Sequence, residues 1–154
     1  MKQLAYGYVI TMSITSRLSR AGIQLREQLD DSFPDRKRPD GWVADARHYR
    51  DNPKSDHIPD AQGWVRALDV SVKLGLDAQM HDLADQLRIH GKRGDKRIAY
   101  IIFDGRICSP VLGWRWRKYR GSNPHRQHMH ISFTKKGDND GRFFNVPLLG
   151  GDLV

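Results

Sequence analysis

The chain has 154 residues, of which 38% are apolar, and no internal repeat, so it is long enough for one compact domain and too short for two of ordinary size. Its formal net charge of +8 predicts attraction to polyanions such as nucleic acid, an anionic membrane or an anionic cell wall, and charge alone does not choose among them. The single cysteine, Cys108, excludes an intrachain disulfide and a cysteine-based structural zinc site, and it favours synthesis in a reducing cytoplasm.

The N-terminal region predicts a strand, a helix and then a long irregular segment. Residues 4–12 are apolar, but they are too few to span a bilayer and no small-residue cleavage site follows, so we expect a strand with neither a signal peptide nor membrane insertion. Ser16 is expected to cap a helix whose apolar residues recur at helical spacing over 18–29 and which ends before Pro34. Four prolines and many charges within 33–62 predict irregular chain, which at this length is unusual in a small domain unless it builds a site.

Two strands are expected in the middle of the chain. Residues 64–72 alternate in polarity, which places Asp69 on one face of a strand and Leu68 on the other. Residues 98–103 form a short apolar strand, and Asp104-Gly105 marks a turn into a further extended segment.

A second helix and a C-terminal tail complete the predicted elements. Asp77 is expected to cap a helix with apolar residues on one side, which ends near Gly91. Residues 135–154 are rich in glycine and aspartate and are interpreted as a tail or the start of a linker, which leaves a core of about residues 5–134. The whole pattern favours one α+β domain over 1–154, in which helices pack on one face of a small antiparallel sheet.

The segment 123–133 contains three of the seven histidines of the chain, namely His125, His128 and His130. Alternate side chains of an extended strand share a face, so His128 and His130 lie together while Met129 points to the other side. Imidazole is a common metal ligand and a common base near neutral pH. The cluster therefore predicts a metal site on one strand face.

Two residues elsewhere can complete such a site. His57 stands at the end of a loop and Asp69 on the strand that follows, so together with His130 they supply two imidazoles and one carboxylate. Three protein ligands leave one coordination position for water, which is the arrangement of catalytic zinc. A zinc-bound water is acidified toward neutrality and becomes a nucleophile, so we expect one Zn²⁺ as the cofactor.

The same segments resemble those of a family of zinc peptidases. The first is Ser55-Asp56-His57 with Gly63, Ala67 and Asp69, and the second is His128-Met129-His130. In this order they are similar to the D-alanyl-D-alanine carboxypeptidases and L-alanyl-D-glutamate endopeptidases, whose fold group also includes the hedgehog signalling domain. More narrowly, residues 17–134 resemble the peptidase domains of endolysins from phages of actinobacteria. The further segments that carry this resemblance are Gly41–His48, Val65–Asp69, Gly113–Trp116 and Gly121–His125.

The resemblance implies that His57, Asp69 and His130 bind zinc. The family commonly places its aspartate seven residues after the histidine, whereas Asp69 follows His57 by twelve, so the chain between them must bulge and Asp60 is the alternative ligand. We favour Asp69 because it lies on an alternating strand, whereas Asp60 lies in a proline-rich loop where a turn role suffices.

The resemblance also implies residues for proton transfer. Many relatives carry a glutamate three residues before the last histidine, but Gln127 stands there and cannot accept a proton. Another branch of the family uses histidines, which His128 and His125 match. His128 is therefore the expected general base, and His125 is expected to orient it or to stabilise the oxyanion.

Substrates of the family carry free carboxylates, so an arginine is expected near the site. Arg50, shortly before His57, is our candidate for this substrate-binding role. His48 is a second candidate, because it belongs to the resembling segment Gly41–His48. Arg66 is expected to face away from Asp69.

The expected function is hydrolysis of a peptide bond in bacterial peptidoglycan, by a monomeric endolysin domain made in the host cytoplasm and acting on the cell wall after release. An anionic wall suits the positive charge, and no specific nucleic-acid partner is expected. Two alternatives stay open. The basic aromatic stretch 114–120 is also typical of a metal-dependent nuclease or a basic nucleic-acid-binding protein, and a zinc-stabilised interaction module would keep the metal without catalysis.

Overall fold

The computed structural model describes residues 15–75 and 79–152. The strand expected at 4–12 and the helix cap expected at Asp77 lie outside these residues. The helices are α2 (Arg20–Ser32), α3 (Ala46–Asp51) and α4 (Met80–Lys92), with 3-10 helices η1 (Lys135–Gly137) and η2 (Pro147–Leu149). The strands are β1 (Arg17–Leu18), β2 (Trp64–Val65), β3 (Ala67–Ser71), β4 (Ile98–Phe103), β5 (Arg106–Cys108), β6 (Arg117–Lys118) and β7 (His128–Phe133).

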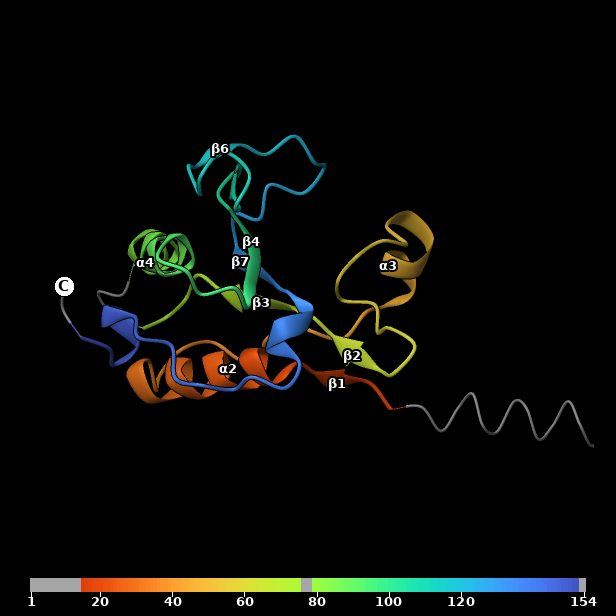
Figure 1. Ribbon diagram of the computed structural model, residues 1–154. Helices are drawn as coiled ribbons and strands as arrows, with labels where there is room; N and C mark the ends of the chain where they lie inside the picture. Colours follow the sequence, from red (N-terminus) through yellow and green to blue (C-terminus); the bar gives the residue numbers. More distant parts are fainter. Residues whose placement is uncertain (1–14, 76–78, 153–154) are drawn as a thin grey trace, which may run out of the picture.

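A five-stranded sheet organises the molecule, with strand order β3-β7-β4-β5-β6 and every neighbouring pair antiparallel (Figure 1). The short strands β1 and β2 form a separate parallel pair. This arrangement confirms the expected α+β class. Within the described residues, no helix combines the length and apolar character needed to cross a bilayer.

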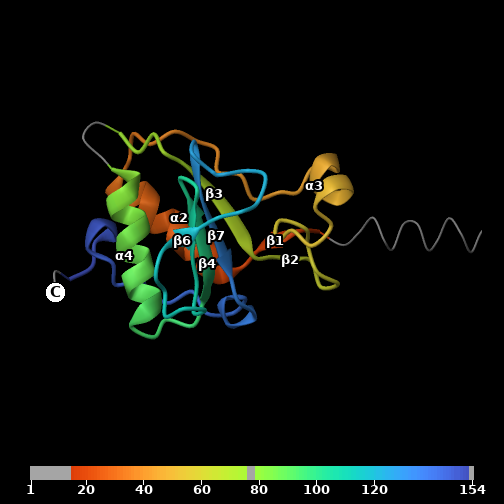
Figure 2. The same cartoon turned by 90° about the horizontal axis from the view of Figure 1, so that it is seen from above.

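The two faces of the sheet have different roles. Figures 1 and 2 show α2 and α4 on one side of the sheet and α3 on the other. Strand alternation sends Leu68, Met129 and Ile131 into the fully buried core against α2 and α4. Asp69 and His130, one position along on the same strands, therefore face the side of α3, where the site is built.

The start of α2 differs from the prediction. Ser19, not Ser16, is the N-cap, and its hydroxyl accepts a hydrogen bond from the backbone of Gly22 at 3.3 Å. The reason is that residues 17–18 remain extended to pair with β2, a contact between distant segments that helical spacing cannot reveal. The end of the helix at Ser32, before Pro34, is as expected.

The C-terminal segment is part of the core, so its interpretation as a tail or linker was wrong for residues 135–152. Phe144, Val146 and Leu149 are buried against the helices. The buried side chain of Gln28 on α2 donates hydrogen bonds to the carbonyls of Phe144 and Leu149 at 2.8 and 2.9 Å, and accepts one from the backbone of Phe144 at 2.8 Å. These apolar residues are separated by glycine, proline and polar residues, so they leave no periodic signal in the sequence.

The segment 33–62 is largely irregular, as expected, but it also contains α3. Asp45 caps this helix and accepts a hydrogen bond from the backbone of His48, while the His48 ring bonds back to the backbone of Asp45. Earlier in the segment, Gly41 pairs with Asp69 through two backbone hydrogen bonds of 3.0 and 2.7 Å. A Cβ at Gly41 would lie 3.4 Å from the Cβ of Asp69, so the small residue lets the segment run close beside β3.

Candidate metal centre

His57, Asp69 and His130 converge on one point, and their ligand atoms all lie within 4.8 Å of one another. Nε2 of His57 lies 3.2 Å from Oδ2 of Asp69, and Nδ1 of His130 lies 2.9 Å from Oδ1 of the same carboxylate. The two imidazoles are buried and Asp69 is half-buried. The group can hold a metal ion.

Strand pairing and a closed loop bring the three residues together. Asp69 and His130 are directly opposite partners on β3 and β7. His57 joins them because the backbone N–H of Arg66 donates to the carbonyl of Asp56 at 3.1 Å, which closes the base of the loop between them. The longer spacing between His57 and Asp69 is thus absorbed by a bulge, as expected.

Asp60 lies apart from this group and serves the turn within that loop. Its carboxylate accepts hydrogen bonds from the backbones of Gln62 and Trp64, both at 2.9 Å, and pairs with Arg66 at 2.6 Å. Arg66 also pairs with Asp138 at 2.7 Å, so it faces away from Asp69 as expected. The structure therefore groups Asp69, and not Asp60, with the two histidines.

Each imidazole has one nitrogen held by the protein and one directed at Asp69. Nδ1 of His57 lies 3.2 Å from the carbonyl of Trp42, so it carries the hydrogen and Nε2 is left for an ion. The Ser132 hydroxyl donates to Asp56 at 2.9 Å, so its oxygen accepts from Nε2 of His130 at 2.8 Å, which leaves Nδ1 for an ion. Two oriented imidazoles and one carboxylate are a donor set found at catalytic metal sites, including those of zinc.

The charge of the site also suits a cation. Burial alone would raise the pKa of Asp69, but hydrogen bonds and charge from His130 and His57 hold this pKa well below its usual range. Burial alone would lower the pKa of His57, yet Asp69 raises it above the ordinary value. Asp69 is therefore anionic at every physiological pH and can attract a metal ion.

The three residues lie in the wall of an open cavity of about 640 Å³. Its lining is rich in polar side chains and carries both signs of charge, with Arg47 and Lys54 beside Asp51 and Asp56. The His48 ring lies 5.1 Å from the His57 ring between centroids, so the structure brings this predicted substrate-binding residue to the site. A cavity of this volume is within the range of ligand-binding sites.

The structure places the two predicted proton-transfer residues differently. His125 lines the cavity, and its ring centroid lies 5.2 Å from that of His130. His128 shares the strand face of His130, but it is exposed at the first position of β7, opposite Ser71, and is not among the described residues that line the cavity. His125 has a left-handed backbone, φ 53°, which turns the chain before β7 and directs its ring inward.

Arg50, the predicted substrate-binding arginine, does not reach the cavity. Its side chain is 70% exposed and pairs with the neighbouring Asp51 at 3.0 Å. Arg47 lines the cavity instead. Arg47 and Arg50 both lie on α3, a helix that the proline-rich sequence does not signal, and Arg50 is the one paired with Asp51.

No match was found when the chain was compared with protein-family models, with curated proteins and with solved structures. The site is therefore interpreted from its own geometry.

Three supporting residues were missed in the sequence. Ser132 and Tyr100 both hydrogen-bond to Asp56, at 2.9 and 2.7 Å, and Trp42 contributes only its carbonyl to His57. Ser132 could have been found, because it lies two positions after His130 and so shares its strand face. Tyr100 comes from the adjacent strand β4, and only the register of the sheet brings it to the site.

Proposed function

We propose that this protein is a zinc-dependent peptidase that hydrolyses a peptide bond in bacterial peptidoglycan, as a phage endolysin does. The observation that carries the proposal is a group of two histidines and one aspartate, able to hold a metal ion, in the wall of an open, polar cavity. Three protein ligands suit a catalytic ion, since a structural zinc is closed by four. When bound by His57, Asp69 and His130, zinc would acidify a water molecule and polarise a carbonyl group.

His125 is the residue best placed to accept a proton in this cavity. Burial, followed by the charge of His130, lowers the pKa of His125 to about 4, so its ring is neutral near pH 7. Tyr100 also lines the cavity, but its hydroxyl donates to Asp56 and burial raises its pKa above the ordinary value. We assign the general-base role to His125 because of its position in the cavity; the lowered pKa keeps the ring neutral but also makes it a weaker base than an ordinary imidazole. His128 is the residue that the sequence favours for this role.

Two cationic side chains, set among the carboxylates of Asp51, Asp56 and Asp69 in the cavity lining, support a substrate that carries a free carboxylate. Arg47 and Lys54 line the cavity together with the neutral donors Ser122 and Asn123. Stem peptides of peptidoglycan carry free carboxylates, and an arginine can bind a carboxylate through two parallel hydrogen bonds. The net charge of +8 would also draw the protein to an anionic wall, most strongly at low ionic strength.

The test is digestion of purified peptidoglycan in the presence of zinc, with mass spectrometry of the released fragments. We expect new amino groups at one type of peptide bond with the unchanged chain and with Asp60→Asn, and none with His57→Ala. Cleavage of DNA or RNA with no new amino groups from the wall would instead favour a nuclease. Tight zinc binding without cleavage of either peptidoglycan or nucleic acid would favour a zinc-stabilised interaction module.

A further inference from the structure

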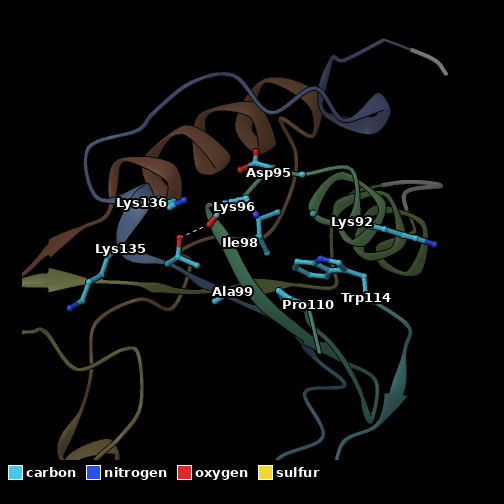
Figure 3. A pocket seen from close by; sticks show the side chains of 12 residues that line it. Lys92, Asp95, Lys96, Ile98, Ala99, Pro110, Trp114, Lys135 and Lys136 are labelled. Atoms are coloured by element: carbon cyan, nitrogen blue, oxygen red, sulfur yellow. Dashed lines mark hydrogen bonds between the residues drawn. The ribbon is translucent and has the colours of Figure 1, made fainter. Parts of the chain in front are cut away.

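A second cavity lies between the end of α4, the start of β4 and η1 (Figure 3). It encloses about 680 Å³, a volume typical of ligand sites, and shares no lining residue with the metal cavity. Ile98 lines it and pairs with Phe133, whereas Tyr100 lines the metal cavity and pairs with Ser132 across a register shift, so the two cavities use opposite faces of β4. Its apolar lining consists of Ile98, Ala99, Pro110 and Trp114.

Four exposed lysines surround this apolar lining, namely Lys92, Lys96, Lys135 and Lys136. Figure 3 shows Lys92 and Lys135 on opposite sides of the cavity, with their ammonium groups directed outward. Among the described residues, every ion pair is made by arginine or histidine, so none of these lysines has a carboxylate partner there. The positive charge around the cavity is therefore not compensated within the described structure.

The one carboxylate that lines the cavity is already occupied. Asp95 pairs with Arg97 at 2.6 Å and with His90 at 2.7 Å. The carbonyls of Ile89 and Gly91 at the end of α4 accept hydrogen bonds from the backbone of Arg93. The acceptors near the cavity are thus used internally, whereas the ammonium donors are free to bind a ligand.

Trp114 adds a further unused donor. Its side chain is only 6% exposed and its ring packs directly on Gly91, where an added Cβ would lie 2.7 Å from the ring. Its backbone has a left-handed φ of 67°, which only a well-determined loop maintains. No hydrogen bond from its Nε1 is made within the described residues, whereas Nε1 of Trp116 donates to Asp85 at 3.0 Å. This N–H is not among the fully buried donors without a partner, of which Arg26 Nε is the one found in the described residues, so it is accessible and can donate a hydrogen bond to a ligand in the cavity.

We propose that this cavity binds an acidic saccharide, that is, a sugar or polyol chain that carries carboxylate or phosphate groups. Such a chain supplies the acceptors that the indole and the lysines lack, and its C–H surfaces suit the apolar lining of Ile98, Ala99 and Pro110. Nucleic acid fits less well, because the Trp114 ring face is covered by Gly91 and cannot stack on a base. This inference goes beyond the peptidase proposal and does not depend on it.

The position of the cavity would let a bound polymer and a substrate in the metal cavity be held at the same time. A polymer bound on this face of β4 would leave the metal cavity on the other face open. A wall polymer held there would keep the protein near its insoluble substrate without competing with it.

The experiment is titration calorimetry of the whole chain, with zinc and again with a chelator. The ligands are a galacturonic acid tetrasaccharide, a glycerol phosphate tetramer, neutral maltotetraose and a short DNA duplex. We expect at least one of the two acidic chains to bind equally well with zinc or chelator, and maltotetraose and DNA to bind more weakly. Binding of only the uronate or only the phosphate polymer would identify the anionic group and support the proposal.

Two variants locate the ligand. Replacing the four lysines by glutamine is expected to weaken binding roughly tenfold, whereas glutamine at four exposed basic residues elsewhere changes it less than about threefold. This matched control is Lys37→Gln, Lys73→Gln, Arg115→Gln and Lys118→Gln, which removes the same charge. Ala99→Met fills the apolar lining without changing charge, and is expected to weaken binding as well.

Four results would overturn the proposal. They are no binding of either acidic chain, equal or tighter binding of maltotetraose or DNA, equal losses in the lysine variant and its control, and loss of binding on chelation. If the lysine variant does not fold, Ala99→Met is the deciding variant. An unchanged affinity of Ala99→Met for the acidic chain would place the ligand elsewhere.

Discussion

Asp69 and His130 are directly opposite residues on the adjacent strands β3 and β7, and their side chains meet at 2.9 Å on the face of the sheet that α2 and α4 leave uncovered. The sheet register therefore fixes two of the three ligands. The third, His57, depends on the loop that the backbone contact between Arg66 and Asp56 closes. Metal binding should accordingly be sensitive to the residues that orient the histidines.

Ser132→Ala should weaken zinc binding about 10- to 100-fold, because it removes the oxygen that holds Nε2 of His130 and frees the ring to turn. Competition with a chromophoric chelator measures this affinity without reference to activity. Ser71→Ala is the matched control, since Ser71 is also buried but contacts the backbone of Lys73 and not the metal group. Equal affinities for zinc in the two variants would contradict the orienting role of Ser132.

His125→Ala should retain zinc but lower kcat/KM about 10²- to 10⁴-fold, the usual contribution of a positioned general base. His128→Ala should lower it less than about tenfold, because this side chain is exposed outside the cavity. Steady-state kinetics on a soluble peptidoglycan fragment, with zinc content measured in parallel, compares the two. The reverse order of losses would return the base role to His128, as the sequence alone predicts.

The pKa of His125 can be measured directly. Burial lowers it to about 4, so the ring should stay neutral down to about pH 5, whereas an ordinary histidine titrates near pH 6.5. Because the folded-state pKa is the lower one, this group contributes stability that is present above about pH 6.5 and is lost as the pH falls toward 4. NMR titration of the imidazole resonances checks this, and a midpoint above 6 would contradict the burial of His125.

Gln28→Ala should destabilise the fold by about 3 kcal/mol, because three buried hydrogen bonds to the C-terminal segment are lost and its backbone groups are left without partners. Urea unfolding measures the change. The control is Glu27→Ala, at the preceding position of α2, where the side chain is exposed. It should alter the free energy of unfolding by less than about 0.5 kcal/mol. Equal stability of the Gln28 variant would show that residues 144–149 do not depend on this contact.

Acid should also weaken the attachment of this segment, because Asp95 pairs with Arg97, whose guanidinium lies 3.9 Å from the centre of the Phe144 ring. Burial would raise the pKa of Asp95, but hydrogen bonds from His90 and Arg97 hold it well below its usual range. The stability that this gives is present above about pH 4 and is lost as the pH falls toward the folded-state value. Asp95→Asn should therefore be less stable at neutral pH and lose less stability between about pH 5 and 3 than the unchanged chain. A parallel decline in both proteins, followed by circular dichroism, would exclude this role, and Asp31→Asn at the exposed end of α2 is the control.

The sequence was informative wherever a pattern is local. Alternation over 64–72 placed Asp69 on the opposite face from Leu68, and His128-x-His130 predicted a strand with one functional face. The three residues expected to bind metal are the ones that the structure brings together.

What the sequence did not predict depends on contacts between distant segments. Arg47 lines the cavity in place of Arg50, and both lie on α3, a six-residue helix with a capping box and no buried residue, so the helix has no apolar pattern to predict it. Burial of Phe144 depends on Gln28, more than a hundred residues away, and neither residue signals the other. The inward position of His125 accompanies a left-handed backbone, a conformation that histidine adopts more often than most residues but that is too uncommon to predict at one position.

We propose that His57, Asp69 and His130 hold one catalytic zinc ion. The most direct measurement is the rate of release of amino groups from peptidoglycan while zinc is added back to chelator-treated protein. We predict no release without metal and a rise that reaches its plateau at about one zinc per chain, with no rise in Asp69→Ala. Release that is independent of zinc, or that persists in Asp69→Ala with the same dependence on zinc, would contradict the assignment.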